Sequence, residues 1–394
     1  MTEGTAPATP VAAPKDAPPA SDGPVARILA KLVLPAAAIL LALIVGAVIM
    51  IASSPLVSGS IDFTLPFRAY AALVTGAVGS PNAIISTLAA STPLILAGLG
   101  VGIGFKAGLF NIGAQGQFWM GGLAAAAAGV ATAGLPPVAA IPIAVGAGLL
   151  GGAAYGFIPG FLKAFTGAHE VVTTIMLNYI AVQILAWAAS GPLRGESVSF
   201  ARTETITTAI LPVIVGREGH IGILFAAAMV PLASWLLYRS TLGFEIRTVG
   251  ANPHAARYAG MRPRFLIILT MSIAGLLAGL AGTTEVLGQL HHIPAAYSTS
   301  IGFDAIAVAL LGRSSPMGIL FAGLLFGAMR AGSGLMQIQA GIPVQMVSVL
   351  QAVILFFLAA DVIVRAIFRI RGRGIGSSSE MQTITQSYAD QTAK

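Results

Sequence analysis

The sequence of 394 residues contains no cysteine, and only 9% of its residues are charged. Without cysteine the chain has no disulfide bond, no thiolate metal ligand and no thiol nucleophile. It also lacks the Gly-x-x-x-x-Gly-Lys-Ser/Thr pattern, which excludes ATP binding through a phosphate loop. No Ser/His/Asp motif is visible, and His291 and His292 have no further metal ligand at suitable spacing. We therefore expect neither a catalytic nor a metal site in this chain.

Apolar residues are present in excess. They make up 56% of the chain, and the mean hydropathy is +0.87. Because soluble proteins usually carry about a quarter of charged residues, this balance predicts a multi-pass protein of the cell membrane. The formal net charge of +7 does not indicate nucleic acid as a partner, since the arginines lie in short loops between apolar runs.

Ten apolar runs predict an all-α membrane protein, a polytopic helical bundle of about ten transmembrane helices. A run of about 20 apolar residues is long enough to cross a bilayer. The runs lie at 29–52, 84–105, 108–132, 138–163, 171–190, 220–238, 265–287, 303–312, 316–336 and 344–368. They predict a transmembrane domain at 25–373, between a disordered tail at 1–24 and a polar tail at 374–394.

The distribution of positive charge predicts the orientation of this domain. Cytoplasmic loops of membrane proteins carry an excess of Lys and Arg. If the N-terminus is cytoplasmic, the other cytoplasmic segments carry most of the cationic residues, namely Lys106, Lys163, Arg239, Arg247, Arg257, Arg262, Arg264, Arg313, Arg365, Arg369, Arg371 and Arg373. Both termini and the connector at 239–264 are therefore predicted to be cytoplasmic.

Glycines recur at steps of four residues in several runs, at 148, 152, 156 and 160, at 275 and 279, and at 323 and 327. Small residues on one helical face let two helix backbones approach closely within a membrane. This spacing predicts a compact bundle.

The connector at 239–264 contains the signals of a short helix. Asn252 is a good N-cap residue, Pro253 suits the first helical position and Gly260 suits a C-terminal stop. A short helix held between two spans is suited to enter a groove on a partner and to transmit movement of that partner. An ordinary amphipathic connector is the alternative that spacing alone leaves open.

Asn111 and Asp304 each follow a phenylalanine, Phe110 and Phe303, and each precedes small and apolar residues. A side-chain oxygen in such a position caps a helix N-terminus, so both residues predict helix starts within or near the membrane. Discontinuous helices of this kind bring polar backbone groups to a central cavity. Two ordinary spans that begin at the membrane surface are the alternative.

Glu170, Thr174 and Asn178 recur every fourth residue and therefore share one helical face. A polar face is costly in lipid, so it is expected to line an aqueous path or to form hydrogen bonds between helices. Glu285 and Arg330 also lie in or near the membrane and are predicted to pair near the outer side. Asp361 and Arg365 are spaced for a second local ion pair.

Four blocks of sequence together resemble the ATP-binding-cassette (ABC) importer permeases of the ribose-permease-like family, nucleoside-uptake branch. His254, Ala255, Ala256 and Gly260 are similar to the Glu-Ala-Ala-x-x-x-Gly coupling loop of such permeases, with His254 in place of Glu. The Ile-x-Leu-Pro element that follows this loop in the family is not evident. The other blocks are residues 104–117, 170–178 and 302–312, and the four occur in the family's order.

The resemblance implies the transmembrane permease subunit of an ABC importer that moves a nucleoside or a simple sugar across the cell membrane. The implied partners are a cytoplasmic ABC ATPase that carries ATP and Mg²⁺, a second permease subunit (the same or homologous), an extracytoplasmic solute-binding protein and membrane lipid. This chain itself is expected to be no enzyme and to bind no cofactor. The expected substrate path is formed by Phe110, Asn111, Gln115, Glu170, Thr174, Asn178, Phe303 and Asp304. The expected ATPase-coupling residues are Asn252, Pro253, His254, Ala255, Ala256, Arg257 and Gly260.

A self-sufficient secondary carrier or channel for a small polar solute is the alternative from another class. It requires ion-coupling carboxylates within the membrane, for which the candidates are Glu170, Glu285, Asp304 and Asp361. It also leaves the short connector helix without a role. A membrane-embedded enzyme is disfavoured because no catalytic set of residues is visible.

Overall fold

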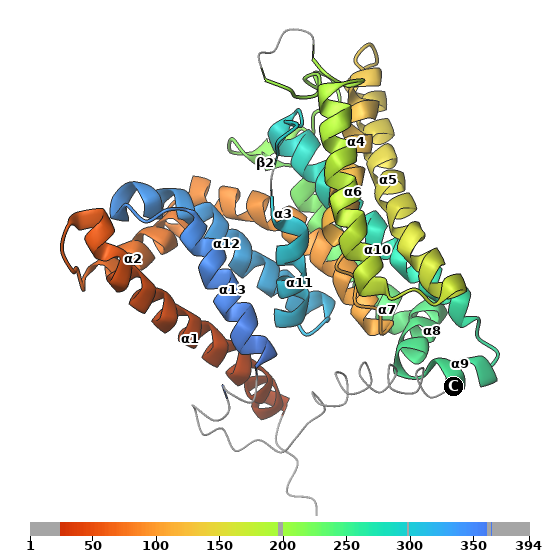
Figure 1. The fold of residues 1–394 in the computed structure, drawn as a ribbon, viewed down its shortest axis with the longest axis horizontal. Coiled ribbons are helices and arrows are strands. Elements are labelled where there is room, and N and C mark those ends of the chain that lie inside the picture. The colour runs from red at the N-terminus through yellow and green to blue at the C-terminus, as the bar shows by residue number, and fades with distance from the viewer. Residues whose placement is uncertain (1–23, 196–199, 298, 361–363, 365–394) are drawn as a thin grey trace, which may run out of the picture.

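The computed structural model describes residues 24–195, 200–297, 299–360 and 364, and within them it is a bundle of helices with one small hairpin (Figure 1). The predicted all-α, polytopic fold class is thereby confirmed. Residues 1–23 of the predicted N-terminal tail, the predicted tail at 374–394 and the Asp361–Arg365 pair lie outside the described residues.

The helices of the described residues follow one another with short connections. They are α1 (Pro24–Ser58), α2 (Leu65–Val78), α3 (Pro81–Lys106), α4 (Ala114–Ala131), α5 (Pro137–Thr166), α6 (Glu170–Ser190), α7 (Gly222–Arg239), α8 (Thr241–Ala251), α9 (Pro253–Tyr258), α10 (Pro263–Glu285), the π-helical turn η1 (Val286–Leu290), α11 (Ile301–Leu311), α12 (Pro316–Ala340) and α13 (Gln345–Ala359). Strands β1 (Val213–Val215) and β2 (Gly219–His220) pair antiparallel between α6 and α7.

Seven stretches of helix in the described part of the chain are long and apolar enough to cross a membrane. They are Pro35–Pro55, Pro81–Lys106, Pro137–Thr166, Glu170–Ser190, Gly222–Arg239, Pro263–Leu290 and Pro316–Ala340. The predicted run at 303–312 forms α11, which has 11 residues and is too short to cross alone. The predicted run at 344–368 contains α13, which has 15 residues in the described part of the chain, and residues 361–363 and 365–368 of this run lie outside the described residues. The count of ten spans therefore stays a prediction.

Close packing of α5 against α10 is made by the glycines whose spacing predicted it. A Cβ atom added to Gly152 would lie 2.3 Å from the carbonyl oxygen of Gly275 and 2.6 Å from Cα of Gly279. A Cβ on Gly156 would lie 2.4 Å from the carbonyl oxygen of Met271. Only glycine permits this approach, so the predicted compact bundle is confirmed at this interface.

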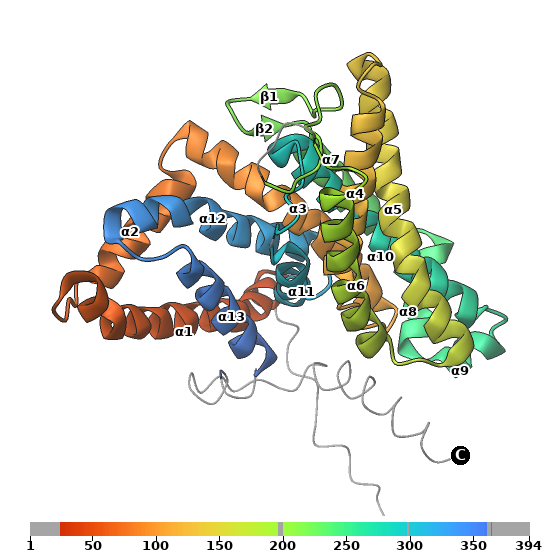
Figure 2. The same cartoon turned by 45° about the horizontal axis from the view of Figure 1, so that its top comes forward.

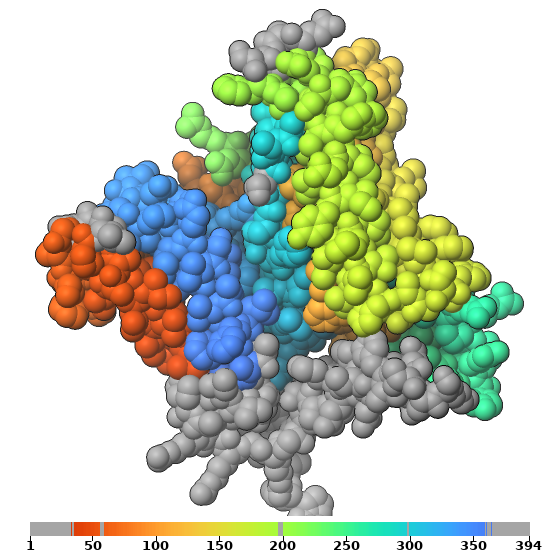
Figure 3. All heavy atoms as spheres, in the orientation of Figure 1, coloured from red at the N-terminus to blue at the C-terminus, as the bar shows by residue number. Residues whose placement is uncertain are grey.

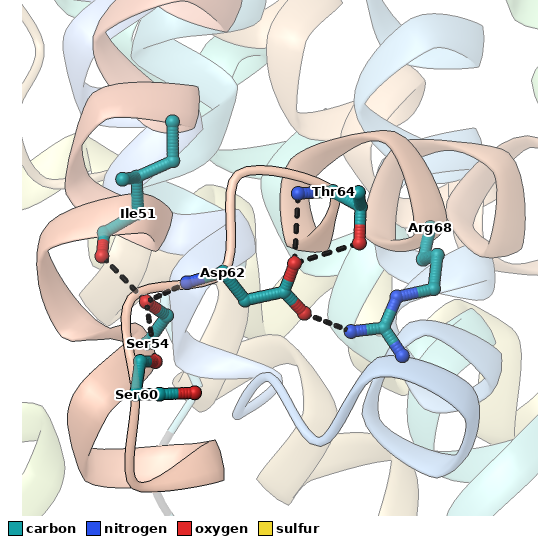
Figure 4. Close-up of polar contacts among 6 residues, drawn as sticks. All are labelled: Ile51, Ser54, Ser60, Asp62, Thr64 and Arg68. Atoms are coloured by element: carbon teal, nitrogen blue, oxygen red, sulfur yellow. Dashed lines mark hydrogen bonds and ion pairs between the residues drawn. The ribbon is translucent and has the colours of Figure 1, made fainter.

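The turn between α1 and α2 is closed by polar side chains (Figure 4). Asp62 accepts hydrogen bonds from the N–H and the hydroxyl of Thr64, at 2.8 and 2.6 Å, and its other carboxylate oxygen pairs with Arg68. The Ser54 hydroxyl accepts the Asp62 N–H at 2.9 Å. The hydrogen bonds from Thr64, followed by the charge of Arg68, lower the pKa of Asp62. No apolar run in the sequence predicted α2, which at 14 residues is too short to cross a bilayer alone.

The two ends of the bundle carry different connections (Figure 2). The β1–β2 hairpin lies at one end, and α8 and α9 lie at the other. The end with α8 and α9 holds the predicted cytoplasmic connector and its arginines. The hairpin end belongs to the segment that the charge distribution places outside the cell.

Candidate functional site

The turn between α3 and α4 is closed by Asn111, which is buried. The Asn111 Oδ1 atom accepts the Gly113 N–H at 2.9 Å, and the Asn111 Nδ2 atom donates to Gln117 Oε1 at 3.0 Å. The helix begins at Ala114 with Gly113 at the N-cap position. The prediction that Asn111 caps this helix is wrong in detail, because its side chain bonds to the backbone two residues on and forms a turn before the helix.

Glu170, Thr174 and Asn178 share one buried face of α6, as their spacing predicted. The Asn178 Oδ1 atom accepts the Gly116 N–H at 2.8 Å, so α6 holds the first turn of α4. The Glu170 carboxylate pairs with Lys163 Nζ at 2.9 Å. These contacts match the alternative of hydrogen bonds between helices. A role in lining an aqueous path stays a prediction.

Gln115 joins the start of α4 to the start of α11. Its Oε1 atom accepts the Gly302 N–H at 2.8 Å, and its Nε2 atom donates to the Thr299 carbonyl at 2.9 Å. A Cβ on Gly302 would lie 2.3 Å from Gln115 Cα, so the two helices touch through backbone. Since the first N–H groups of a helix lack partners within it, Gln115 satisfies one of these groups on α11. The two predicted helix starts therefore meet in space.

Asp304 and Phe303 lie in the first turn of α11, which begins at Ile301 after Ser300. Asp304 therefore does not cap this helix, and that part of the prediction is wrong. Its carboxylate accepts the Ser300 hydroxyl at 2.8 Å. The Phe303 side chain is 46% exposed, and α11 is visible between α6 and α13 in Figure 3. Phe110, by contrast, is half-buried.

Phe110 stacks on Phe105, with ring centroids 5.1 Å apart. Phe110 and Phe303 were both expected in the substrate path. The exposed side chain of Phe303 and the partly buried stack of Phe110 give them different environments in the structure.

Arg330 and Glu285 do not form the predicted direct ion pair among the described residues. Arg330 Nη2 donates to the Thr299 hydroxyl at 3.1 Å, and the Glu285 carboxylate accepts the Tyr297 hydroxyl at 3.0 Å. Trp119 packs edge-to-face on Tyr297, with centroids 5.0 Å apart. Tyr297 and Thr299 were not identified from the sequence, because the described residues between η1 and α11 are non-helical and carry no periodic pattern. Nothing in the sequence distinguished Trp119 from the other apolar residues of α4.

The connector at 239–264 folds into α8 and α9. The Asn252 Oδ1 atom accepts the N–H groups of His254 and Ala255 at 2.9 and 3.0 Å, which confirms the predicted N-cap. Pro253 occupies the first turn, and Gly260 follows the helix in the left-handed region at φ +81°. Both observations match the predicted start and stop of this short helix.

Ala256 is the one buried residue of α9, with 0% of its surface exposed. It belongs to a small apolar cluster with Leu109, Ile246 and Leu266. The Ala256 side chain therefore faces its own chain and not a partner, and a role of this residue in coupling stays a prediction. Tyr258 is 94% exposed, and His254, Ala255 and Arg257 are exposed as well.

His220 lies at the hairpin end of the bundle and is buried. Its Nδ1 atom accepts the Gly222 N–H at 3.2 Å. Burial, followed by the charge of His291, lowers the pKa of His220 to about 4. Within residues 24–195, 200–297, 299–360 and 364, no three His, Cys, Asp or Glu side chains gather as metal ligands would.

Three relatives are similar over most of their length. The guanosine ABC transporter permease protein NupP of Bacillus subtilis is 37% identical, over 86% of this chain and 95% of its own. The nucleoside ABC transporter permease protein NupB of Lactococcus lactis is 36% identical, over 85% and 92%. The glucose ABC transporter permease protein TsgB13 of Haloferax volcanii is 33% identical, over 82% and 86%. No solved structure matches this chain.

A family model described as the permease component of branched-chain amino acid transport systems matches residues 83–359. This range contains the helix starts joined by Gln115, the buried face of α6 and the α8–α9 connector. In systems of this kind the ATPase is a separate subunit, and a solute-binding protein accompanies the permease. The chain belongs to this permease family, and it is a multi-pass membrane subunit of an ABC importer.

Proposed function

We propose that this chain forms the translocation path for a neutral nucleoside or simple sugar. The partners in this proposal are a cytoplasmic ATPase that binds ATP and Mg²⁺, a second permease subunit, membrane lipid and an extracytoplasmic solute-binding protein. The names of the relatives, which refer to guanosine, nucleosides and glucose, support the class of solute. In this proposal the chain itself binds no nucleotide and no metal.

The observation that carries the proposal is the meeting of two helix starts. Gln115 binds Gly302 and Thr299, so non-helical backbone and the start of α11 lie inside the helical bundle. Irregular backbone is tolerated at bilayer depth where it is buried in protein or lines a water-filled cavity. We place the solute beside this junction, on the exposed side of α11.

The residues first expected in the substrate path divide into two groups by their contacts. Phe303 is exposed, and the half-buried Asp304 follows it at the start of α11 without packing into a ring stack as Phe110 does, so we keep these two on the path. The other six, Phe110, Asn111, Gln115, Glu170, Thr174 and Asn178, are buried or half-buried against protein. We assign them the role of holding the starts of α4 and α11 in place.

The outward face of α6 is consistent with contact to a second permease subunit. Exposed apolar and aromatic side chains follow this face, among them Val172, Met176, Tyr179 and Trp187. Lipid or a partner helix covers such a face in a membrane, and α11 lies beside it (Figure 3). A second copy or a homologue on this side would enclose the exposed strip of α11 between two subunits.

The exposed face of α9 is the reason to propose that this helix couples the chain to the ATPase. Ala256 anchors the helix in the chain's own apolar cluster, and Tyr258 projects from the opposite side. A rigid, capped helix with one anchored face and one free face can transmit movement from a partner.

Uptake by the assembled importer tests the proposed function. The chain, its ATPase subunits and its solute-binding protein are reconstituted in proteoliposomes, and uptake of labelled guanosine and glucose is measured. We expect saturable uptake of at least one of them that requires ATP hydrolysis. Equal uptake with a catalytically inactive ATPase would point to a self-sufficient carrier, and absence of uptake of both solutes would refute the proposed solute class.

Coupling through α9 is tested with a variant of the exposed face. Ala255→Asp adds a charge beside the docking surface while leaving the Asn252 side-chain cap intact. We expect the assembled variant to hydrolyse ATP without matching uptake. Normal uptake per ATP hydrolysed would remove α9 from the coupling route.

A further inference from the structure

Arg330 lies deep within α12, a helix of 25 residues that begins at Pro316. At about 1.5 Å per residue it stands about 21 Å from the start of the helix. A cation at bilayer depth is costly, and intramembrane cations usually mark a solute path or pair with other charged groups.

The contacts of Arg330 leave part of its guanidinium unused. Its Nη2 atom donates to the Thr299 hydroxyl at 3.1 Å. Its Nη1 atom is buried and has no hydrogen-bond partner among the described residues. Since guanidinium groups only donate, the missing partner is an acceptor. A buried donor without an acceptor is destabilising, and native proteins rarely contain one without a reason.

The acidic side chains near Arg330 are held by other groups. Glu285 accepts the Tyr297 hydroxyl, and Asp304 accepts the Ser300 hydroxyl. Both interact electrostatically with Arg330 without a direct ion pair. An arginine that pairs with a carboxylate often binds it through two parallel hydrogen bonds. Neither Glu285 nor Asp304 binds Arg330 in this way among the described residues.

We propose that Arg330 recognises the transported solute, with Nη1 donating a hydrogen bond to an oxygen or ring-nitrogen acceptor of a neutral, hydroxyl-bearing ring compound. This inference rests on the proposed function and names the residue that recognises the solute by hydrogen bonding. Phe303 is exposed one residue before Asp304 at the start of α11, so a solute held beside Arg330 would shield this position. Two carboxylates near one guanidinium disfavour an anionic solute such as a phosphorylated nucleoside.

Two variants separate recognition from structure. Arg330→Gln removes the Nη1 donor and the Thr299 contact, whereas Thr299→Val keeps the guanidinium and removes the hydroxyl that contacts Arg330 and Tyr297. Uptake of guanosine by the complete importer in native membranes is measured for both, together with the amount of assembled complex. We expect Arg330→Gln to lower uptake about tenfold or more, and Thr299→Val to lower it much less. Equal uptake defects in the two variants would assign Arg330 a structural role and overturn the proposal.

A thiol reporter tests binding independently of transport. The chain has no cysteine, so Phe303→Cys introduces the only thiol of this subunit, and Leu310→Cys, further along α11, is the control. A membrane-impermeant maleimide labels each variant in the complex, with guanosine or guanosine 5′-monophosphate present. We expect guanosine to slow labelling at position 303 alone, and the monophosphate to slow it much less.

Adding Arg330→Gln to the reporter gives the decisive comparison. Labelling without solute should stay unchanged, which shows that the site is folded, and protection by guanosine should disappear. Unchanged protection in the double variant, or stronger protection by the monophosphate, would overturn the assignment of Arg330. A parent importer that takes up neither guanosine nor glucose would refute the proposed solute class, and with it this inference, whereas the Arg330 variants leave that class untouched.

Discussion

The α5–α10 interface allows a quantitative prediction at one glycine. The substitution Gly152→Ala places a Cβ atom 2.3 Å from the carbonyl oxygen of Gly275 and 2.6 Å from Cα of Gly279. Ordinary van der Waals contact begins near 3.4 Å, so the two helices must separate by about 1 Å. Both contacts are with backbone, which cannot rotate away as a side chain does. Overpacking of this kind costs about 1–3 kcal/mol.

Gly146→Ala is the matched control for this substitution. It lies in the same helix, and a Cβ there meets nothing within 4 Å. Alanine favours the helix by about 0.5–1 kcal/mol over glycine, so this variant should be as stable as the parent or more so. Thermal unfolding of the purified chain in detergent, followed by tryptophan fluorescence, measures both. We expect Gly152→Ala to lower Tm by several degrees relative to Gly146→Ala. Equal Tm values would show that α5 and α10 are not held at this distance.

Three further substitutions or conditions test the connector and the hairpin end. Asn252→Ala removes an acceptor for two N–H groups, and we expect faster hydrogen exchange in α9, with a local cost of about 0.5–2 kcal/mol; unchanged exchange would contradict the role of this cap. Ala256→Asp buries a charge in an apolar cluster and should reduce folded yield in size-exclusion chromatography, whereas Ala255→Asp should not, and equal yields would contradict the burial of Ala256. His220 has a folded-state pKa of about 4, below its ordinary value of 6.5, so the unfolded chain binds more protons and stability falls as pH drops from about 6.5 toward 4. Tm measured across this range should fall less in His220→Gln, and parallel curves would refute the assignment.

Local sequence signals predicted the parts of the structure in which neighbouring residues determine geometry. The cap at Asn252 and the stop at Gly260 need only a few residues of α9, and both were predicted. The glycine steps in α5 and α10 predicted close packing, because helical periodicity fixes which residues share a face.

The arrangement around Arg330 depends on contacts distant in sequence and was not predicted. Gln115 binds Thr299, which lies 184 residues later, and no spacing rule relates such positions. Asn111 and Asp304 were correctly predicted to lie near helix starts, but neither residue caps its helix. A turn closed by Asn111 precedes α4, and α11 begins before Asp304. Short polar side chains form such turns as readily as caps.

A series of contacts within this chain connects α9, the proposed coupling helix, to Arg330, the proposed solute-recognising residue. Ala256 of α9 shares an apolar cluster with Leu109, which lies in the turn between α3 and α4. That turn leads into α4, where Gln115 holds the start of α11 and the carbonyl of Thr299, and the Thr299 hydroxyl accepts a hydrogen bond from Arg330. Closely packed protein transmits a displacement better than it absorbs one. The non-helical residues before α11 have the fewest helical hydrogen bonds along this route, so they are the part most able to change conformation. Movement of α9 by an ATPase would therefore change the conformation at the start of α11, where the Thr299 hydroxyl accepts a hydrogen bond from Arg330.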